Sequence, residues 1–348
     1  MVGSATRAGL LPPGLEGLEM TMDRRAFVGG LASVGGVLAL GVEGAFARLI
    51  ASGGEPAGTL LEWDEARKGA FAMVDLATGG NSLVLISEGE SLVVDTKSPL
   101  LGAAIRGDAG ALGGISGVTL LNTHHHGDHT GGNAAFADVI SYAHKNALPR
   151  IEAQIGRYRS GAERASGEGA AMEAIAARVR EDAPSWTAKH FVPDKAIGDD
   201  GATLEIGDER AEISHYGAGH TDNDLVVRVP GLNLVHTGDL VFSGLHAFFD
   251  PTGGVTAPGW VSSLEGALAL CDADTVVIPG HGPIGDRSII QGAIDYLAAL
   301  IEAVQGELDK GTTKENTQEK SWAFMDGLGF EGVRPRAIGA VYDELIGG

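Results

Sequence analysis

Five side chains with metal-binding chemistry crowd into six consecutive positions of the stretch LLNTHHHGDHTGGN, residues 120–133. They are His124, His125, His126, Asp128 and His129. Imidazole nitrogens with one carboxylate suit a borderline divalent ion such as zinc, and iron or manganese when oxygen ligands increase. A solvated histidine-rich loop is the alternative, but the H-x-H-x-D-H order is specific enough to predict a metal site.

The spacing within this stretch predicts which of its histidines bind metal and which one does not. At the end of a strand, His124 and His126 would point to one face while His125 points to the other. Gly127 then allows a sharp turn, after which the aspartate and the last histidine return towards the same space. We therefore expect His125 to be packed or half exposed, away from the metal ligands.

Three more polar residues follow β-type runs later in the chain, each beside glycine. They are His220 in GAGHTDND, Asp239 in HTGDLVF and His281 in VVIPGHGP. Polar residues at strand ends are where α/β proteins tend to place their sites. Together with the first stretch, they predict one site shared between two sheets.

The elements that must position these residues form two β-rich halves, each followed by helices. Strands are expected over 70–76, 81–89, 90–97, 116–123, 202–208, 210–217, 224–242 and 275–283. Helices are expected over 100–114, 259–272, 286–311 and within an insert at 145–195. This order predicts an α/β fold, an αβ/βα sandwich of two mixed β-sheets flanked by helices.

The N-terminal segment predicts export. Paired arginines at 24–25 precede a Gly/Ala-rich apolar run and a small-x-small sequence at 45–47. This pattern is typical of a secretory signal peptide, and the arginine pair resembles a twin-arginine signal, so we expect a periplasmic or secreted protein. The run is too short and glycine-rich to favour a stable membrane span. The expected segments are a signal peptide or leader over 1–47, a linker and first strand over 48–69, the main domain over 70–285 and a helical segment over 286–348.

The composition of the chain limits the classes of partner that we expect it to bind. The formal net charge of −21 argues against nucleic acid and anionic membrane surfaces. The single cysteine, Cys271, excludes an internal disulfide framework, and its apolar neighbours predict a buried position on a helix. A small-molecule substrate is the expected partner, and no prediction of oligomeric state follows.

The motifs resemble the metallo-β-lactamase-fold hydrolase superfamily over about residues 70–285, in the family's order. The resemblance implies a four-layer αβ/βα sandwich and two divalent metal ions, zinc first, with iron or manganese as alternatives. It implies one ion held by His124, His126 and His220, another held by Asp128, His129 and His281, and Asp239 bridging both. Many dedicated zinc β-lactamases carry a cysteine or serine where Asp239 stands, which weakens that assignment without excluding β-lactam hydrolysis.

The ligand set predicts a mechanism and leaves alternatives open. Two metal ions would lower the pKa of a bridging water to give hydroxide, and Asp128 would be the catalytic residue that orients it and accepts its proton. We expect cleavage of an ester, thioester, lactone or amide of a small molecule, with β-lactams as the second substrate class. An iron-dependent oxidoreductase or dioxygenase on the same fold is a further alternative, although we find no flavin-binding motif after residue 285.

Residues around the expected ligands receive supporting roles. Asp95 ends a strand at the same edge, where a hydrogen bond to a ligand histidine and a purely structural role are both open. Thr221 and Asp224 are expected to fix the turn that presents His220. The loop 245–254 is either a substrate-facing aromatic loop or a core turn. Structural roles are favoured for four other histidines, His144, His190, His215 and His236.

Overall fold

Two mixed β-sheets face each other in the computed structural model, which describes residues 58–347. The signal peptide predicted over 1–47 and the first part of the predicted linker lie outside these residues. The larger sheet has the spatial order β1 (Asp64–Arg67), β2 (Ala70–Met73), β3 (Ser82–Ser87), β4 (Glu90–Val94), β5 (Gly117–Leu121), β6 (Ile140–His144), β7 (Lys195–Ile197). The smaller has the order β12 (Val276–Ile278), β11 (Leu234–His236), β10 (Val226–Val229), β9 (Glu209–Ser214), β8 (Ala202–Ile206).

Both sheets combine parallel and antiparallel neighbours. In the larger sheet β1 to β4 pair antiparallel and β4 to β7 pair parallel. In the smaller sheet β8 to β11 pair antiparallel, whereas β11 and β12 are parallel. The expected α/β sandwich of two mixed sheets is therefore confirmed.

Strand residues alternate between two apolar cores. In β3, Leu83 and Leu85 face the core between the sheets, while Val84 faces the helix layer on the other side. Since both faces of these strands are buried, their sequences are almost continuously apolar. In β4, Val94 and Val93 divide between the same two cores.

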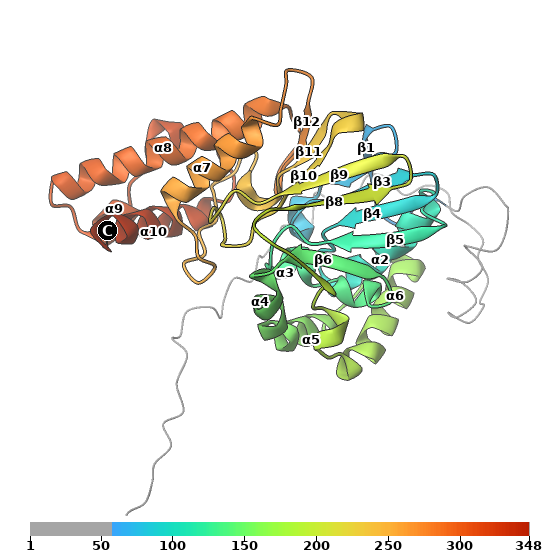
Figure 1. Ribbon diagram of the computed structural model, residues 1–348. Helices are drawn as coiled ribbons and strands as arrows, with labels where there is room; N and C mark the ends of the chain where they lie inside the picture. The colour runs from blue at the N-terminus through green and yellow to red at the C-terminus, as the bar shows by residue number, and fades with distance from the viewer. Residues whose placement is uncertain (1–57, 348) are drawn as a thin grey trace, which may run out of the picture. The chain divides into compact units, whose positions relative to one another are not determined.

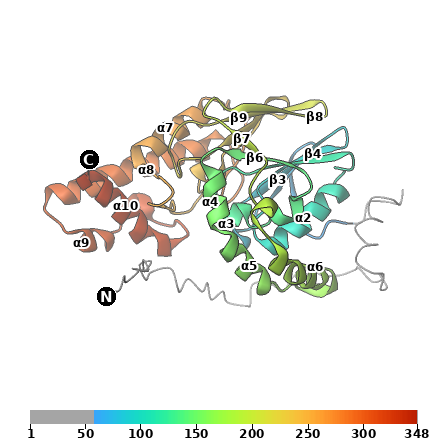
Figure 2. The same ribbon diagram turned by 60° about the horizontal axis from the view of Figure 1, so that its bottom comes forward.

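Helices cover the outer faces, as Figures 1 and 2 show. Over the larger sheet and beside it lie α2 (Pro99–Ala111), α3 (Gly127–Thr130), α4 (Ala147–Ala153), α5 (Ile155–Glu163), α6 (Gly169–Asp182). Beside the smaller sheet lie α7 (Ala257–Leu268), α8 (Arg287–Asp309), α9 (Lys314–Gln318), α10 (Arg334–Gly347). The core on this side combines residues of α7, α8 and α10 with residues of the smaller sheet. Among the described helices, none is long and apolar enough to cross a membrane.

The topology brings strand ends from both sheets to one edge. Because β4 and β5 are parallel, Asp95 and the histidine stretch follow their carboxyl ends at the same side. Because β11 and β12 are parallel, Asp239 and His281 likewise follow neighbouring strand ends. His220 lies in the connection between β9 and β10.

Several elements end earlier than expected or were not expected at all. β5 ends at Leu121 rather than at 123, because the Thr123 N–H donates to the Asp95 carboxylate (2.8 Å) and not to a neighbouring strand. α7 ends at Leu268 rather than at 272, and the Asp272 side chain then accepts the Asp274 N–H in a turn. β6 and β7 were missed, since their few apolar residues are interleaved with polar ones.

The predicted helices of the insert and the C-terminal region are present with breaks between them. The helical part of 145–195 consists of α4, α5 and α6. The predicted helix over 286–311 is α8, and the remainder of the predicted helical segment 286–348 contains α9 and α10. The limits of the predicted segments 48–69, 70–285 and 286–348 stay predictions.

Candidate metal centre

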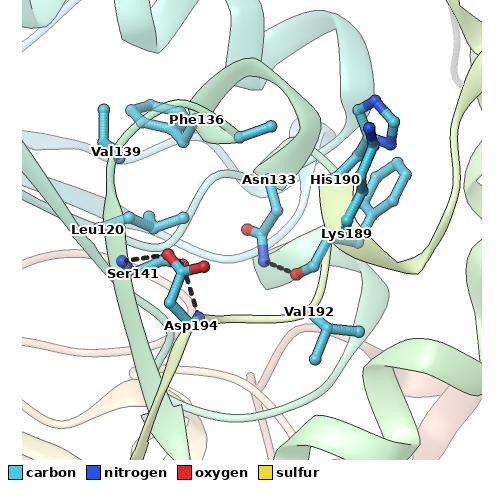
Figure 3. Close-up of a pocket in the computed structure, with 11 residues that line it drawn as sticks. Leu120, Asn133, Phe136, Val139, Ser141, Lys189, His190, Val192 and Asp194 are labelled. Carbon is cyan, nitrogen blue, oxygen red and sulfur yellow. Dashed lines mark hydrogen bonds between the residues drawn. The ribbon is translucent and has the colours of Figure 1, made fainter.

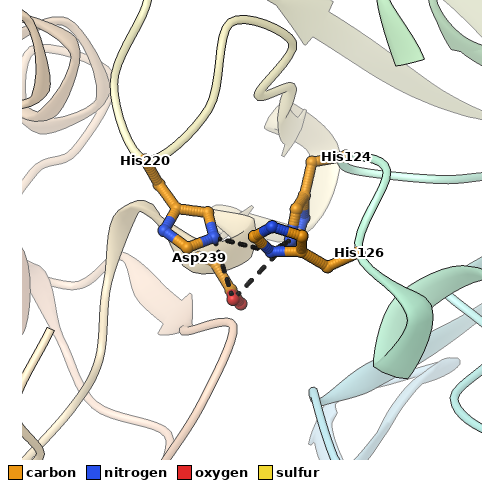
Figure 4. A group of neighbouring side chains, drawn as sticks. All are labelled: His124, His126, His220 and Asp239. Atoms are coloured by element: carbon orange, nitrogen blue, oxygen red, sulfur yellow. Dashed lines mark hydrogen bonds and ion pairs between the residues drawn. The ribbon is translucent and has the colours of Figure 1, made fainter. Parts of the chain in front are cut away.

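The histidine stretch is a loop that ends in one turn of helix. Residues 122–126 leave β5 through bends, and α3 begins at Gly127 with His126 at its N-cap. The strand-alternation argument for His124 and His126 was therefore wrong in its premise, because neither residue lies in a strand. The loop itself still turns both imidazoles into the same space (Figure 4).

Four side chains converge in a first group, which is drawn in Figure 4. His126 Nδ1 lies 3.0 Å from His124 Nε2 and 3.0 Å from His220 Nε2. Asp239 Oδ2 lies 3.6 Å from His124 Nε2 and 3.4 Å from His220 Nε2. Ligands about 2.0–2.1 Å from a tetrahedral ion lie roughly 3.3–3.4 Å apart, so these separations match one shared ion.

Three more side chains form a second group on the other side of Asp239. His281 Nε2 lies 3.3 Å from Asp128 Oδ2 and 3.4 Å from Asp239 Oδ2. His129 Nε2 lies 3.1 Å from Asp239 Oδ1 and 3.9 Å from Asp128 Oδ2. Asp239 thus contacts both groups, and all seven sequence-predicted residues meet at one place.

Hydrogen bonds at the far side of each ring fix where the lone pairs point. His220 Nδ1 lies 3.0 Å from the Phe248 carbonyl oxygen, which can only accept, so Nδ1 carries the proton and Nε2 is a lone pair. Asp250 Oδ2 accepts from His126 Nε2 at 3.0 Å, which leaves Nδ1 as its lone pair. Thr123 donates its hydroxyl to Asp95, so it accepts from His124 Nδ1 (3.0 Å), and His124 Nε2 is again a lone pair.

The His126 lone pair therefore faces those of His124 and His220 at 3.0 Å each, an arrangement that repels unless a cation lies between them. In the second group, buried His129 Nε2 and Asp239 Oδ1 lie 3.1 Å apart, and neither makes a hydrogen bond to any other described residue. Burying such atoms is costly unless something binds them. The donor set of five imidazoles and two carboxylates fits two divalent ions.

The two groups differ in how they hold protons without metal. Burial lowers the pKa of His220 to about 3 and lowers the pKa of His124 well below its ordinary value. Burial also opposes charge on His281, but the carboxylates of Asp239 and Asp128 outweigh it and raise its pKa to about 9. The same two aspartates, with Asp95, raise the pKa of His129 well above its ordinary value.

Asp95 forms a hydrogen bond to a histidine of the second group. Of the two roles left open for it, this is the hydrogen bond to an expected ligand and not a purely structural role. Its carboxylate accepts from the Thr123 N–H at 2.8 Å, the Thr123 hydroxyl at 2.7 Å and His129 Nδ1 at 2.7 Å. A carboxylate on the far nitrogen of an imidazole fixes the ring and raises its basicity. Asp95 is itself fully buried and has a positive φ of 62°, so the strand end is held in a fixed turn.

Sequence reasoning missed Asp250, which does the same for the first group. It lies in the loop 245–254, which the sequence predicted only as a substrate-facing aromatic loop or a core turn. Its position before a Pro-Thr-Gly-Gly turn was the available signal, but the contact to His126 spans 124 positions of the chain. Within this loop Phe249 is a core residue, whereas Phe248 lies near the His126 ring, with centroids 5.9 Å apart.

The turn that presents His220 is held as expected. Asp224 accepts from the Thr221 N–H at 2.8 Å and the Thr221 hydroxyl at 2.6 Å. Between these two residues, the Asn223 side chain accepts from the His125 N–H at 3.0 Å and contacts the His125 ring. His125 is thus buried outside both groups and joins the histidine stretch to the His220 turn.

The remaining histidines make structural contacts. His144 and His215 stack with centroids 4.1 Å apart, and their third neighbour is the exposed Asp199. Buried His236 accepts from the Gly238 N–H, and His190 binds Thr187 at the surface. Cys271 lies beyond the end of α7 and is half-buried, so its predicted position within a helix was wrong.

A small cavity behind the histidine stretch shows how the loop is anchored (Figure 3). Asn133 donates to the Phe191 carbonyl at 2.8 Å, and Asp194 accepts from the Ser141 hydroxyl at 3.0 Å. The cavity volume of about 10 Å³ holds at most one water, so this is a packing feature and not a substrate site. Asn133 also exchanges hydrogen bonds with Asn122, directly before the loop.

Comparisons with known proteins identify sequence relatives over part of the chain. A metallo-beta-lactamase type 2 from Bacillus cereus is 30% identical over 94 residues, 27% of this chain and 37% of that protein. A probable hydroxyacylglutathione hydrolase from Schizosaccharomyces pombe is 29% identical over 165 residues, 47% of each. The chain thus matches about a third to a half of the length of these curated relatives.

Solved structures show the same fold. The structure of DIM-1 metallo-beta-lactamase exposed to ceftazidime has a TM-score of 0.50 and 21% identity, covering 69% of this chain and 97% of that one. A family model described as the metallo-beta-lactamase superfamily matches residues 76–281, which is more than half of the 348 residues. The chain therefore belongs to the metallo-beta-lactamase superfamily.

Proposed function

We propose that this protein is an exported hydrolase that binds two divalent metal ions, zinc by preference, and cleaves an ester, thioester, lactone or amide bond of a small molecule. One observation carries the proposal. The His126 lone pair faces those of two other imidazoles at 3.0 Å each, and the buried Asp239 carboxylate beside them also contacts the second group. Family membership supports it, since the named relatives are hydrolases.

The proposed ligand atoms follow from the hydrogen bonds of each ring. One ion would be held by His124 Nε2, His126 Nδ1 and His220 Nε2. The other would be held by Asp128, His129 Nε2 and His281 Nε2. Asp239 would bridge them, because its carboxylate contacts both groups. Two bound ions would supply Lewis acidity and an acidified water.

Asp128 is the proposed catalytic residue because its carboxylate contacts the site and is the most exposed of the seven side chains. Its side chain is 43% exposed, whereas those of His129 and Asp239 are 0% and 3% exposed. Burial opposes its ionisation, but His129 and His281 hold the pKa of Asp128 well below its usual range. It is therefore an ionised carboxylate that can orient an attacking water and take its proton.

A substrate panel on the metal-reconstituted protein tests the proposal. It should include esters, thioesters, lactones, amides and phosphodiesters, each assayed with zinc, iron and manganese. We expect turnover in at least one of the first four classes, abolished by chelation and restored by metal. His124→Ala should lose it, while His190→Ala, a surface histidine outside the site, should keep it. Turnover that survives complete chelation would contradict the proposal.

β-Lactam hydrolysis is the second candidate, favoured by the likeness to a metallo-beta-lactamase of Bacillus cereus over 94 residues. A nitrocefin assay on the same protein separates it from ester or thioester turnover. Iron chemistry is a further candidate, since two of the seven expected ligands are oxygen donors. Metal analysis of protein purified without added zinc distinguishes it, because a redox site would hold iron.

Export is part of the proposal and rests on the N-terminal sequence. The arginine pair at 24–25, the apolar run and the small residues at 45–47 have the order of a twin-arginine signal. Cell fractionation tests it: the native chain should appear outside the cytoplasm in shortened form. Replacement of both arginines by lysine should keep it inside, and unchanged distribution would contradict the twin-arginine route.

A further inference from the structure

A pocket lined mostly by apolar side chains lies between α8 and the segments 240–247 and 324–328. Its volume is about 440 Å³, within the range of small-molecule sites. Its principal walls are Phe242, Leu245, Trp260, Tyr296, Phe324 and Leu328. A concave pocket of this size with a mostly apolar lining is typical of a small-molecule site.

Two walls of this pocket, here called the α8 pocket, are also walls of the metal centre. The Phe242 ring stacks on the His281 ring with centroids 5.1 Å apart and planes 8° apart. Trp260 lies against the His220 ring at 5.1 Å. The pocket is therefore separated from one ligand histidine of each group by a single aromatic ring.

The backbone connects the pocket to the centre as well. The Ser243 N–H donates to the His281 carbonyl at 2.8 Å, and the Gly329 N–H donates to the Gly244 carbonyl at 2.9 Å. Next along the chain, Phe330 brings its ring to the edge of His281 at 5.8 Å. Two hydrogen-bonded segments thus run from the pocket wall to the proposed reaction site.

The pocket walls determine what kind of group can enter. Its Tyr296 hydroxyl is already paired with His246 Nδ1 at 3.0 Å, so it adds little polar recognition. Gly292 and Asp295 on α8 also line the pocket and are exposed, so the pocket is open to solvent on this side. At about 30 Å³ for each water-sized group, a volume of about 440 Å³ holds roughly fifteen groups, so an acyl chain of eight to ten carbons fits inside it.

We propose that the α8 pocket binds an aliphatic acyl chain of the substrate, so that the enzyme prefers medium-chain acyl compounds over acetyl compounds. This proposal rests on the proposed hydrolase function for its kinetic part and on the pocket alone for its binding part. α8, Phe324 and Leu328 lie beyond residue 281, where the family match ends. The C-terminal region, whose role the sequence did not reveal, thereby becomes the part that selects the substrate.

A binding experiment tests the pocket independently of catalysis. The uncharged fluorescent probe N-phenyl-1-naphthylamine is titrated into metal-free and metal-loaded protein, and octanoate is used as competitor. Ala293→Phe fills the pocket from α8, while Ala298→Phe places the same ring on an exposed position of the same helix. We expect saturable binding, displaced by octanoate, that weakens at least tenfold in Ala293→Phe and is unchanged in Ala298→Phe.

A second filling variant keeps this test decisive. Leu328→Trp fills the pocket from the opposite wall, and circular dichroism checks the fold of each variant. Absence of saturable binding in the native protein would overturn the proposal. Equal binding by the native protein and a folded filled variant would also overturn it. A change of oligomeric state with filling, measured by sedimentation, would assign the pocket to a second copy and overturn it too.

Kinetics then decide whether the bound chain belongs to the substrate. Nitrophenyl esters from acetate to octanoate are compared by kcat/KM. We expect a rise of about threefold per added methylene and a ratio of octanoate to acetate that falls towards one in Ala293→Phe. Ester turnover without chain-length preference would overturn the proposal while leaving the hydrolase intact. If no ester is cleaved, thioesters and lactones of the same chain lengths are compared in the same way. Probe binding without cleavage of any of the three series would contradict the acyl-hydrolase function.

Discussion

Asp128 makes the sharpest residue-level prediction, because its role in the reaction can be separated from its role in binding. Asp128→Ala removes the carboxylate proposed to orient water and take its proton, but it leaves the first group of three histidines and Asp239 complete. We expect kcat to fall about 10²- to 10⁴-fold. Metal analysis should still find the first site filled, while the second site loses affinity.

The matched control is Asp208→Ala, which removes an exposed aspartate in the turn between β8 and β9. Its activity and metal content should equal those of the native protein. Full activity of Asp128→Ala with two bound ions would refute the assignment. Loss of both ions together with activity would assign Asp128 a structural role instead.

The protonation of the two groups predicts a difference in how metal binding depends on pH. In the metal-free protein His281 has a pKa raised to about 9, so an ion entering the second group must displace a proton at neutral pH. His220 has a pKa lowered to about 3, so it is already neutral above pH 5. Affinity of the second site should therefore rise as pH rises from 6 to 9, by up to about tenfold per unit for each proton displaced.

Calorimetric titration in buffers of different ionisation enthalpy measures the protons released by each equivalent of zinc. The second equivalent should release more protons than the first at pH 7, and the difference should shrink by pH 9. His281→Ala supplies the control, since it removes one displaced proton. Equal release by both equivalents at every pH would contradict the assignment of protons to the second group.

At the scale of elements, the connection between β2 and β3 packs against α3. The contact is so close that a methyl group added to this connection would disturb the site. A Cβ added to Gly80 would overlap the imidazole of His129, on which the second group depends. Gly80→Ala should therefore displace this ring and weaken the second metal site by about tenfold or more, comparable to losing a supporting partner.

Gly110→Ala is the control for this prediction. Gly110 lies in α2 with open space around its Cβ position, so alanine should be neutral or stabilise by up to about 1 kcal/mol. Metal titration and thermal unfolding of both variants provide the comparison. Native affinity in Gly80→Ala would show that the loop can move aside without cost to His129.

The elements also show what sequence could predict and why the rest escaped it. The ends of strands could be predicted because apolar runs stop at glycine and polar residues. For this reason Asp239 and His281 could be predicted as members of the site. The strand before the histidines was predicted too long, because its end depends on Asp95, a residue that follows another strand. Asp250 was missed for the same reason: its partner, His126, is close only in the folded chain.

Across the whole molecule, the site joins the two sheets. The histidine stretch follows β5 of the larger sheet, whereas His220, Asp239 and His281 follow strands of the smaller one. The core between the sheets is apolar, whereas at this edge imidazoles and carboxylates from both sheets face one another. Bound metal would therefore act as a clamp between the halves, not only as a catalyst.

This arrangement predicts that metal removal destabilises the entire fold. An ion that binds only the native state at 1,000 times its Kd contributes about 4 kcal/mol, and in a domain of this size that corresponds to a rise in Tm of roughly 5–10 °C. Chelated protein should therefore unfold earlier in scanning calorimetry, and zinc should restore the transition. Magnesium, which prefers oxygen ligands, should not. The double variant His124→Ala, His281→Ala weakens both groups and should unfold at one temperature with or without zinc. Equal Tm values for chelated and zinc-loaded native protein would contradict the clamp, because the buried lone pairs would then tolerate one another without a cation.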